Sequence, residues 1–310
     1  MKFGNWLSLG LLAVGLLCNS GAQAQGKLIV GYSTAPDFAA AFIAKERGYF
    51  EKRKLDVELK FVTLTSNMPA ALVSGSVQIG GSTPPVILQA VDGGLDLVGV
   101  AGGGVYDNTR GVVQIVARAG TSIGSAKDLV GKKFGVPGLN GTLHVMVRKW
   151  LMDKGVDPKG VTFIEVSLPQ IPDVMKGGTI DAAVTGEPFV GRMVATQGAR
   201  IVPGFSTDLP SGFSTVMYAA TRTWAAANAA QLAAFRAAIA EAIGFANGNR
   251  DQAYEDLGKY FKVPPPALRA TPWPVLSADL SEPQMSFWVD AMSKQQMLKK
   301  SPSPASLVVR

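Results

Sequence analysis

Short apolar segments alternate with helical segments from Lys27 onward, and this alternation limits the possible folds more than any other feature of the chain. Strand-like runs followed by helices are typical of α/β proteins with parallel sheets. The same order of segments recurs about a hundred residues further on. We therefore expect two α/β lobes of similar design. The expected strands are 27–31, 55–61, 77–80, 95–101, 133–136, 161–166 and 180–185, and the helices between them begin near 37, 68, 84, 142 and 171.

The first 24 residues have the pattern of a secretory signal peptide. Lys2 precedes an almost continuously apolar run, Leu7 to Leu17, and the small residues Ala22 and Ala24 fit cleavage after Ala24. The run is shorter than the ~20 residues of a membrane span, and we expect no later segment to match one. Cleavage would remove Cys18, the single cysteine, which follows Leu17 and therefore does not fit a lipoprotein signal. No disulfide is expected in the remaining chain.

The composition excludes several classes of protein. Hydrophobic residues make up 47% of the 310 residues, so the chain is not disordered, and its length fits roughly two domains. The single histidine, His144, supplies neither a metal cluster nor a serine–histidine relay, so we expect no metal and no catalytic residue. We interpret it as structural. The formal net charge of +7 comes from scattered Lys and Arg, which does not indicate a nucleic-acid partner.

The C-terminal third has a different pattern, which is mainly helical. Helices are expected over 224–248, over 250–261 and from Ser281 to about 299. Ser281 and Gln284 have the spacing of a capping box. The proline segments 264–266 and 272–274 interrupt the helices, and the tail 301–310, with two Ser-Pro pairs, is expected to be poorly ordered.

Polar loops follow four of the expected strands. In open parallel sheets, ligands bind beyond the carboxyl ends of the strands, where helix N-termini also favour anions. The loops are 32–37, 81–85, 138–142 and 185–188, and they contain Tyr32, Ser82, Thr83, Thr142 and Glu187. Each hydroxyl and the Glu187 carboxylate could contact a ligand or cap the helix that follows, and the sequence leaves both roles open. We interpret Asp37 as a cap of the first helix.

Several motifs occur in an order and spacing that resemble one family. They are Ala44-Lys-Glu-Arg-Gly-Tyr-Phe50 with Leu55-Asp-Val-Glu58, then Ala71-Leu-Val-Ser-Gly-Ser-Val-Gln-Ile-Gly80, Ala126-Lys-Asp-Leu-Val-Gly-Lys-Lys-Phe-Gly-Val-Pro137 and Gly186-Glu-Pro-Phe189. The chain resembles the periplasmic solute-binding proteins of nitrate, sulfonate, taurine and pyrimidine-precursor ABC importers. The resemblance covers about residues 27–220 well and the rest only loosely.

The resemblance implies a periplasmic binding protein fold of type II, in which two α/β lobes are joined by two crossing strands and the ligand cleft lies between them. The crossings would lie near 112–118 and near 215–220. Lobe one would consist of residues 26–113 plus 219–310, and lobe two of residues 114–218.

The resemblance also implies a set of ligand contacts. They are Ser33 and Thr34 after the first strand, Ser82 and Thr83 in lobe one, and Asn140, Gly141, Thr142 and Glu187 in lobe two. None of these loops contains Lys or Arg, so Arg110 near the hinge is added as a candidate partner for an anion. The implied ligand is a small organic anion, such as a sulfonate, taurine, nitrate or an aromatic or heterocyclic acid. An organic acid that carries an amide or an aromatic group stays open.

The function implied by the resemblance is capture without chemistry or a cofactor. A periplasmic monomer would close on its ligand and dock on an ABC permease in the inner membrane. Two alternatives remain. One is an enzyme like the thiamine-pyrimidine synthases, which share the fold and use a lysine-bound cofactor and a histidine. The other is a binding protein that serves a tripartite transporter or a sensor.

Overall fold

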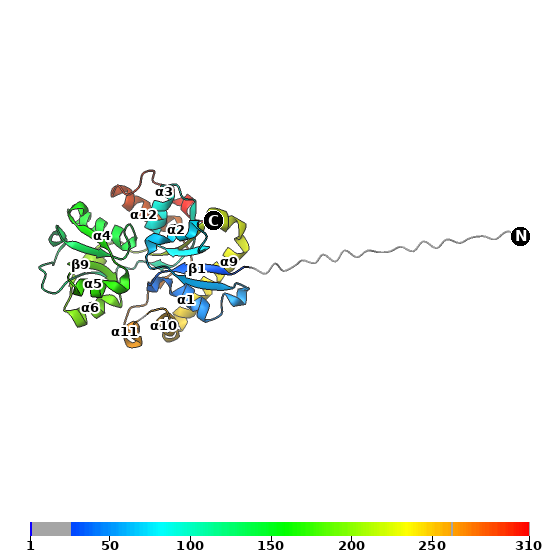
Figure 1. Ribbon diagram of the computed structural model, residues 1–310, viewed down its shortest axis with the longest axis horizontal. Helices are drawn as coiled ribbons and strands as arrows, with labels where there is room; N and C mark the ends of the chain where they lie inside the picture. Colours follow the sequence, from blue (N-terminus) through cyan, green and yellow to red (C-terminus); the bar gives the residue numbers. More distant parts are fainter. Residues whose placement is uncertain (2–25, 262, 310) are drawn as a thin grey trace.

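The computed structural model describes residue 1, residues 26–261 and residues 263–309 (Figure 1). The predicted signal peptide lies outside the described residues, apart from Met1. The chain forms two α/β lobes. The middle of the sequence, drawn in green in Figure 1, forms one lobe, and both flanking parts form the other.

Each lobe is built on a five-stranded mixed sheet. In the first sheet the strands lie in the order β2 (Val57–Phe61), β1 (Leu28–Tyr32), β3 (Ile79–Ser82), β11 (Met217–Thr221) and β4 (Leu97–Gly102). In the second the order is β10 (Arg200–Val202), β6 (Val113–Ala117), β9 (Ala182–Gly186), β7 (Lys133–Val136) and β8 (Thr162–Glu165). In each sheet one strand that follows a lobe crossing, β11 or β6, runs antiparallel to its neighbours.

The helices that follow the parallel strands agree with the sequence pattern, except the short helix Phe205–Asp208, which was not expected. In the first lobe they are α1 (Ala39–Glu46), α2 (Met68–Val73) and α3 (Pro84–Asp92), and in the second α4 (Thr142–Asp153), α5 (Ile171–Lys176), α6 (Phe189–Gln197) and α7 (Phe205–Asp208). The C-terminal part adds α8 (Arg222–Ala227), α9 (Ala229–Gly248), α10 (Arg250–Gly258), α11 (Pro265–Arg269) and α12 (Glu282–Lys294). The capping box at Ser281 and Gln284 is confirmed.

Two antiparallel backbone segments carry the chain between the lobes. Tyr106 N–H donates to Phe213 O, and Gly212 N–H donates to Tyr106 O, both at 2.9 Å. The short strand β5 (Gly104–Val105) also pairs with β12 (Val275–Leu276). The crossing therefore lies several residues before the positions 112–118 and 215–220 that we expected, since β6 and β11 already belong to the sheets of the two lobes.

The long helix α9 packs on α1 in the first lobe. Phe235 of α9 stacks on Phe50 with ring centroids 5.8 Å apart, and both rings are fully buried. By length and composition alone α9 could span a membrane, contrary to our expectation for the segments after residue 24. Its buried side chains belong to the core of the first lobe.

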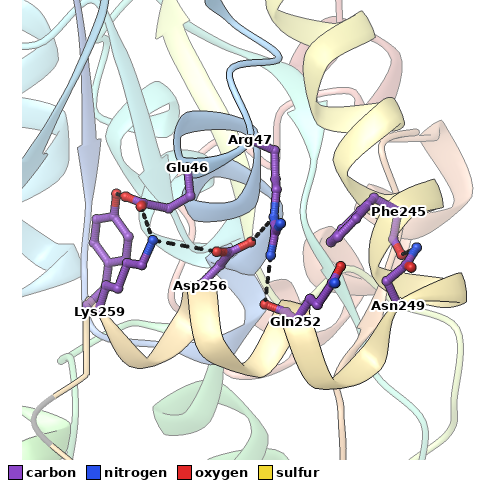
Figure 2. Close-up of polar contacts among 8 residues, drawn as sticks. Glu46, Arg47, Phe245, Asn249, Gln252, Asp256 and Lys259 are labelled. Carbon is purple, nitrogen blue, oxygen red and sulfur yellow. Dashed lines mark hydrogen bonds and ion pairs between the residues drawn. The ribbon is translucent and has the colours of Figure 1, made fainter.

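Helix α10 is attached to α1 by charged side chains (Figure 2). Arg47 donates from Nε to Asp256 Oδ2 at 2.7 Å, and its guanidinium lies 4.7 Å from the centroid of the Phe245 ring. Lys259 pairs with Glu46 on the other side of Asp256. Asp256 is buried, while its neighbours Arg47 and Lys259 are partly exposed, so this cluster joins the N-terminal and C-terminal segments of one lobe at the edge of its core.

Helix α12 packs against the crossing segments and contacts both α3 and α4. Trp288 is fully buried and donates from Nε1 to Ser214 O at 2.8 Å. The tail after α12 is ordered, contrary to our expectation, over residues 301–309. Leu307 is fully buried and Val308 bridges to Gly99 of β4, because the edge of the first sheet offers an unpaired strand and an apolar site.

Candidate functional site

A cleft lies between the lobes at the carboxyl ends of the parallel strands. It has a volume of about 950 Å³, part of which is open to solvent. Its walls are mostly apolar, with a few polar groups, which is typical of small-molecule sites. The apolar side chains include Phe38, Tyr106, Val112, Val113, Leu143, Met146, Leu168, Phe189 and Val216.

The structure brings six of the ten candidate residues together in the lining of this cleft. They come from both lobes and are Ser33, Thr34, Thr83, Gly141, Thr142 and Glu187. Thr83 is only 7% exposed, and its Oγ1 has no hydrogen-bond partner among the described residues. A Cβ placed on Gly141 would lie 3.6 Å from Thr83 Oγ1, so the starts of α3 and α4 face one another across the cleft.

The four other candidates lie outside the lining. Tyr32 packs in the first lobe, with its ring centroid 5.0 Å from that of Phe42. Ser82 is fully buried behind Thr83. Asn140 adopts a left-handed conformation and donates its backbone N–H to His144 Nδ1 at 2.9 Å. Arg110 is held by other partners, because it donates to Asp107 Oδ2 and to Trp273 O, both at 3.1 Å.

His144 lies inside α4 and does not line the cleft. It is buried, its ring lies 4.5 Å from that of Phe163 between centroids, and its Nδ1 accepts the Asn140 N–H. Burial, with Arg148 nearby, lowers the pKa of this imidazole to about 3. The ring is therefore neutral at physiological pH, and its contacts are those of a structural side chain.

Asp37 is a cleft residue that the sequence analysis interpreted as a helix cap. It lies in a short 3₁₀ turn, Pro36–Phe38, and its Oδ1 accepts a hydrogen bond from the Thr215 hydroxyl. A methyl group on Gly104 would overlap both atoms of this hydrogen bond, so only glycine leaves room for it. Burial raises the pKa of the Asp37 carboxyl, while the hydrogen bond from Thr215 acts in the opposite direction.

Glu187 lines the cleft and also caps a helix. Its Oε2 accepts the backbone N–H of Gly191, in the first turn of α6, at 3.0 Å. The two roles that the sequence left open are therefore compatible in the structure, because one carboxylate offers several acceptor sites. Asp37 and Glu187 are the charged residues of the described lining, and no Lys, Arg or His is among them.

The lobes also touch at the edge of the cleft. Ser66, in the turn Thr65–Asn67 of the first lobe, donates to Glu165 Oε1 of the second at 2.9 Å. The same carboxylate oxygen accepts the backbone N–H of Leu139 at 2.9 Å. A Cβ on Gly138 would lie 2.9 Å from Thr65 Oγ1, closer than ordinary contact. The structure therefore shows the two lobes closed on each other.

Among the described residues, no group of three or more His, Cys, Asp or Glu side chains is placed to hold a metal ion. The cleft thus consists of apolar walls, hydroxyl groups and two carboxylates. It can enclose a small molecule and hydrogen-bond to it.

The sequence profile of the family described as NMT1/THI5 like matches residues 35–253, more than half of the chain. A Haemophilus influenzae protein whose name provisionally assigns it to thiamine biosynthesis is 27% identical over 163 residues, 53% of this chain and 50% of that protein. A Brucella abortus protein provisionally named a binding protein is 26% identical over 223 residues, 71% of this chain and 67% of that protein. The chain thus matches only half the length of the first of these relatives.

Solved structures share the fold. The alkanesulfonate-binding protein of Xanthomonas axonopodis, bound to MOPS, superposes with a TM-score of 0.77 at 19% identity, covering 92% of this chain and 98% of that one. The nitrate-binding protein of Synechocystis superposes with a TM-score of 0.75 at 17% identity, covering 91% and 84%. At such low identity the likeness concerns the fold, which is the two-lobed binding-protein fold predicted from the sequence.

Proposed function

This chain belongs to the NMT1/THI5-like family, and from that premise we propose that it is the substrate-binding component of an ABC importer. The observation that carries the proposal is the cleft between two lobes, lined by side chains from both. A ligand that contacts both lobes stabilises the closed form, which shifts the population of the protein toward closure. The closed protein then docks, as a monomer in the periplasm, on a permease in the membrane.

The division into lobes follows the sheets. We propose a discontinuous lobe one, residues 26–113 plus 219–310, and a lobe two of residues 114–218. The grouping is supported by the sheets, because β1 to β4 and β11 form one and β6 to β10 form the other. Since β6 and β11 each lie entirely in one sheet, the boundaries fall in the crossing segments just before these two strands.

Binding without chemistry is favoured over the enzyme alternative by the side chains of the cleft. A lysine-bound cofactor needs a lysine within reach, and no lysine is among the described residues that line the cleft. The histidine such an enzyme would use is also missing from this lining, and the imidazole of His144 is already bonded at Nδ1.

The test is a thermal-shift screen over sulfonates, nitrate, aromatic carboxylates, pyrimidines and organic amines, followed by mass spectrometry of any ligand after incubation with the protein. We expect a ligand that raises the Tm and is recovered unchanged. Conversion of the ligand, or a pyridoxal absorbance band that disappears when one lysine is replaced, would refute the proposal.

The charges of the lining argue against the organic anion that the resemblance implies. Arg110, the one cation proposed from the sequence, donates to Asp107 and Trp273 outside the cleft. An anion would therefore be placed beside two carboxylates without a cation to balance them, which is unfavourable in a partly enclosed site.

A further inference from the structure

We propose that the ligand carries a cationic or hydrogen-bond-donating nitrogen group on an apolar body, and that Asp37 selects it. The proposal rests on the proposed function, since it names the ligand class of the same cleft. The proposed nitrogen group is a cation or a neutral donor, unlike the anions in the names of the alkanesulfonate- and nitrate-binding proteins of the same fold.

The helix starts around the cleft supply few backbone donors for an anion. Pro84 and Pro85 begin α3, and proline has no backbone N–H, so this start lacks two of its donors. Pro36 begins the 3₁₀ turn that carries Asp37. At the start of α6, Glu187 already accepts the N–H of Gly191. The start of α4, which follows the N-cap Gly141, is the helix start in this lining that has neither a proline in its first positions nor a carboxylate bonded to its backbone.

The Asp37 carboxylate has room for a further hydrogen-bond donor. Among the described residues, Thr215 is the one whose side chain donates a hydrogen bond to the Asp37 carboxylate, and this bond occupies Oδ1. Asp37 is half-buried, and a half-buried carboxylate without a cation beside it is unfavourable. An ammonium, amidinium or amide N–H of a ligand would supply the missing donor, and charge-assisted hydrogen bonds of this kind are the strong ones.

The Asp37 carboxylate is held in a fixed position. Thr215 lies between the crossing segment and β11, and its backbone carbonyl also accepts a hydrogen bond from Thr142 of the second lobe at 2.7 Å. Asp37 is thus linked through Thr215 to both lobes, and Gly104 leaves the space that this arrangement needs. A ligand that binds Asp37 therefore contacts the point where the lobes meet.

The walls of the cleft are mostly apolar and come from both lobes. Phe38 belongs to the first lobe, Val216 directly precedes β11 of the first sheet, and Leu143, Met146 and Phe189 belong to the second lobe. Such walls favour an aromatic or aliphatic body, while the free hydroxyl of Thr83 can serve one further polar group. The class is therefore an organic amine, amidine or amide of net positive or zero charge.

The test uses matched sets of an acid, an amide and an amidine built on benzene, pyridine and cyclohexane, together with taurine, methanesulfonate and nitrate. Binding to the full chain is measured by thermal shift and by isothermal titration calorimetry at pH 7. We expect the amidinium or amide members to bind and the acids and sulfonates not to bind.

Two variants identify the partner of the ligand. Asp37→Asn keeps an acceptor for the Thr215 hydroxyl but removes the charge, so the affinity for the amidinium probe should fall about tenfold or more. Asp251→Asn, an exposed change of the same charge in α10, should leave the affinity unchanged.

The results separate the two proposals. An acid, sulfonate or nitrate that binds and closes the lobes would overturn the ligand class and leave the proposed function intact. Failure of every amidine and amide to bind, or equal affinity for the amidinium in Asp37→Asn, would also overturn the inference. Conversion of a probe into another compound would instead contradict the proposed function.

Discussion

The hydrogen bond between Ser66 and Glu165 joins the lobes at the edge of the cleft, so its removal should open the protein. We consider the change Ser66→Ala, which deletes the donor at 2.9 Å from Glu165 Oε1. Glu165 keeps its place, because it still accepts the N–H of Leu139. The change therefore affects the contact between lobes and leaves the structure inside each lobe intact.

The expected size follows from the type of bond. Hydrogen bonds to charged groups contribute roughly 1.5–3 kcal/mol, and partial exposure reduces this one to about 1 kcal/mol. That free energy corresponds to about a fivefold fall in the ratio of closed to open molecules. Where the closed form is a minority without ligand, the apparent Kd should rise by the same factor, since only closed molecules have the complete site.

Pulsed electron–electron double resonance can measure this ratio without a ligand. Spin labels at Ala70→Cys in the first lobe and Lys159→Cys in the second, on a Cys18→Ser background, report the distance between the lobes. Ser74→Ala is the control, because the described partners of Ser74 Oγ lie in its own lobe: it donates to Ala71 O and accepts the N–H of Ser76. An unchanged distance distribution in Ser66→Ala, or the same change in the control, would refute the reasoning.

Three further changes test other parts of the structure. Asp37→Asn removes a half-buried charge and should raise the Tm of the ligand-free protein at pH 7 by about 2–4 °C, as ~1 kcal/mol does in domains of this size. Because burial raises the pKa of Asp37 in the folded state, this gain in Tm should shrink as the pH falls through that pKa. Asp251→Asn should show no gain in Tm in the same calorimetric series. Gly104→Ala should weaken ligand binding in calorimetry at least as much as Asp37→Asn, since the added methyl displaces the Asp37 carboxylate; unchanged affinity would contradict this geometry. Asp256→Asn should lower the free energy of unfolding in urea by about 1–3 kcal/mol, because it breaks the ion pair of a buried carboxylate with Arg47. Glu255→Gln, in an exposed pair with Arg269, should change this free energy by less than about 1 kcal/mol. Equal effects of the two changes would show that burial does not matter here.

Much of the fold could be predicted from the sequence because its signals are local. The first strand, expected over 27–31, is Leu28–Tyr32 in the structure, and the helix expected from Thr142 begins at that residue. The strands β6 and β11 were not distinguished from the crossings beside them. Their pairing partners lie far away in the sequence, so their neighbours give no local signal of which lobe they join.

The position of the cleft could be predicted from the sequence, but the place of Asp37 in its lining could not. Loops at the carboxyl ends of parallel strands converge by topology alone, which is why Thr83 and Glu187 were found. Asp37 precedes a helix and therefore resembles a cap, and its true partner, Thr215, is 178 residues away. Arg110 has its partner three residues back, at Asp107, and this pair removes it from the cleft.

Small-angle X-ray scattering of the full chain, with and without a saturating ligand from the screen, tests the central claim most directly. We expect the radius of gyration to fall on binding and to return to its starting value when the ligand is dialysed away unchanged. A radius that stays the same with the ligand bound in the cleft would contradict capture by lobe closure.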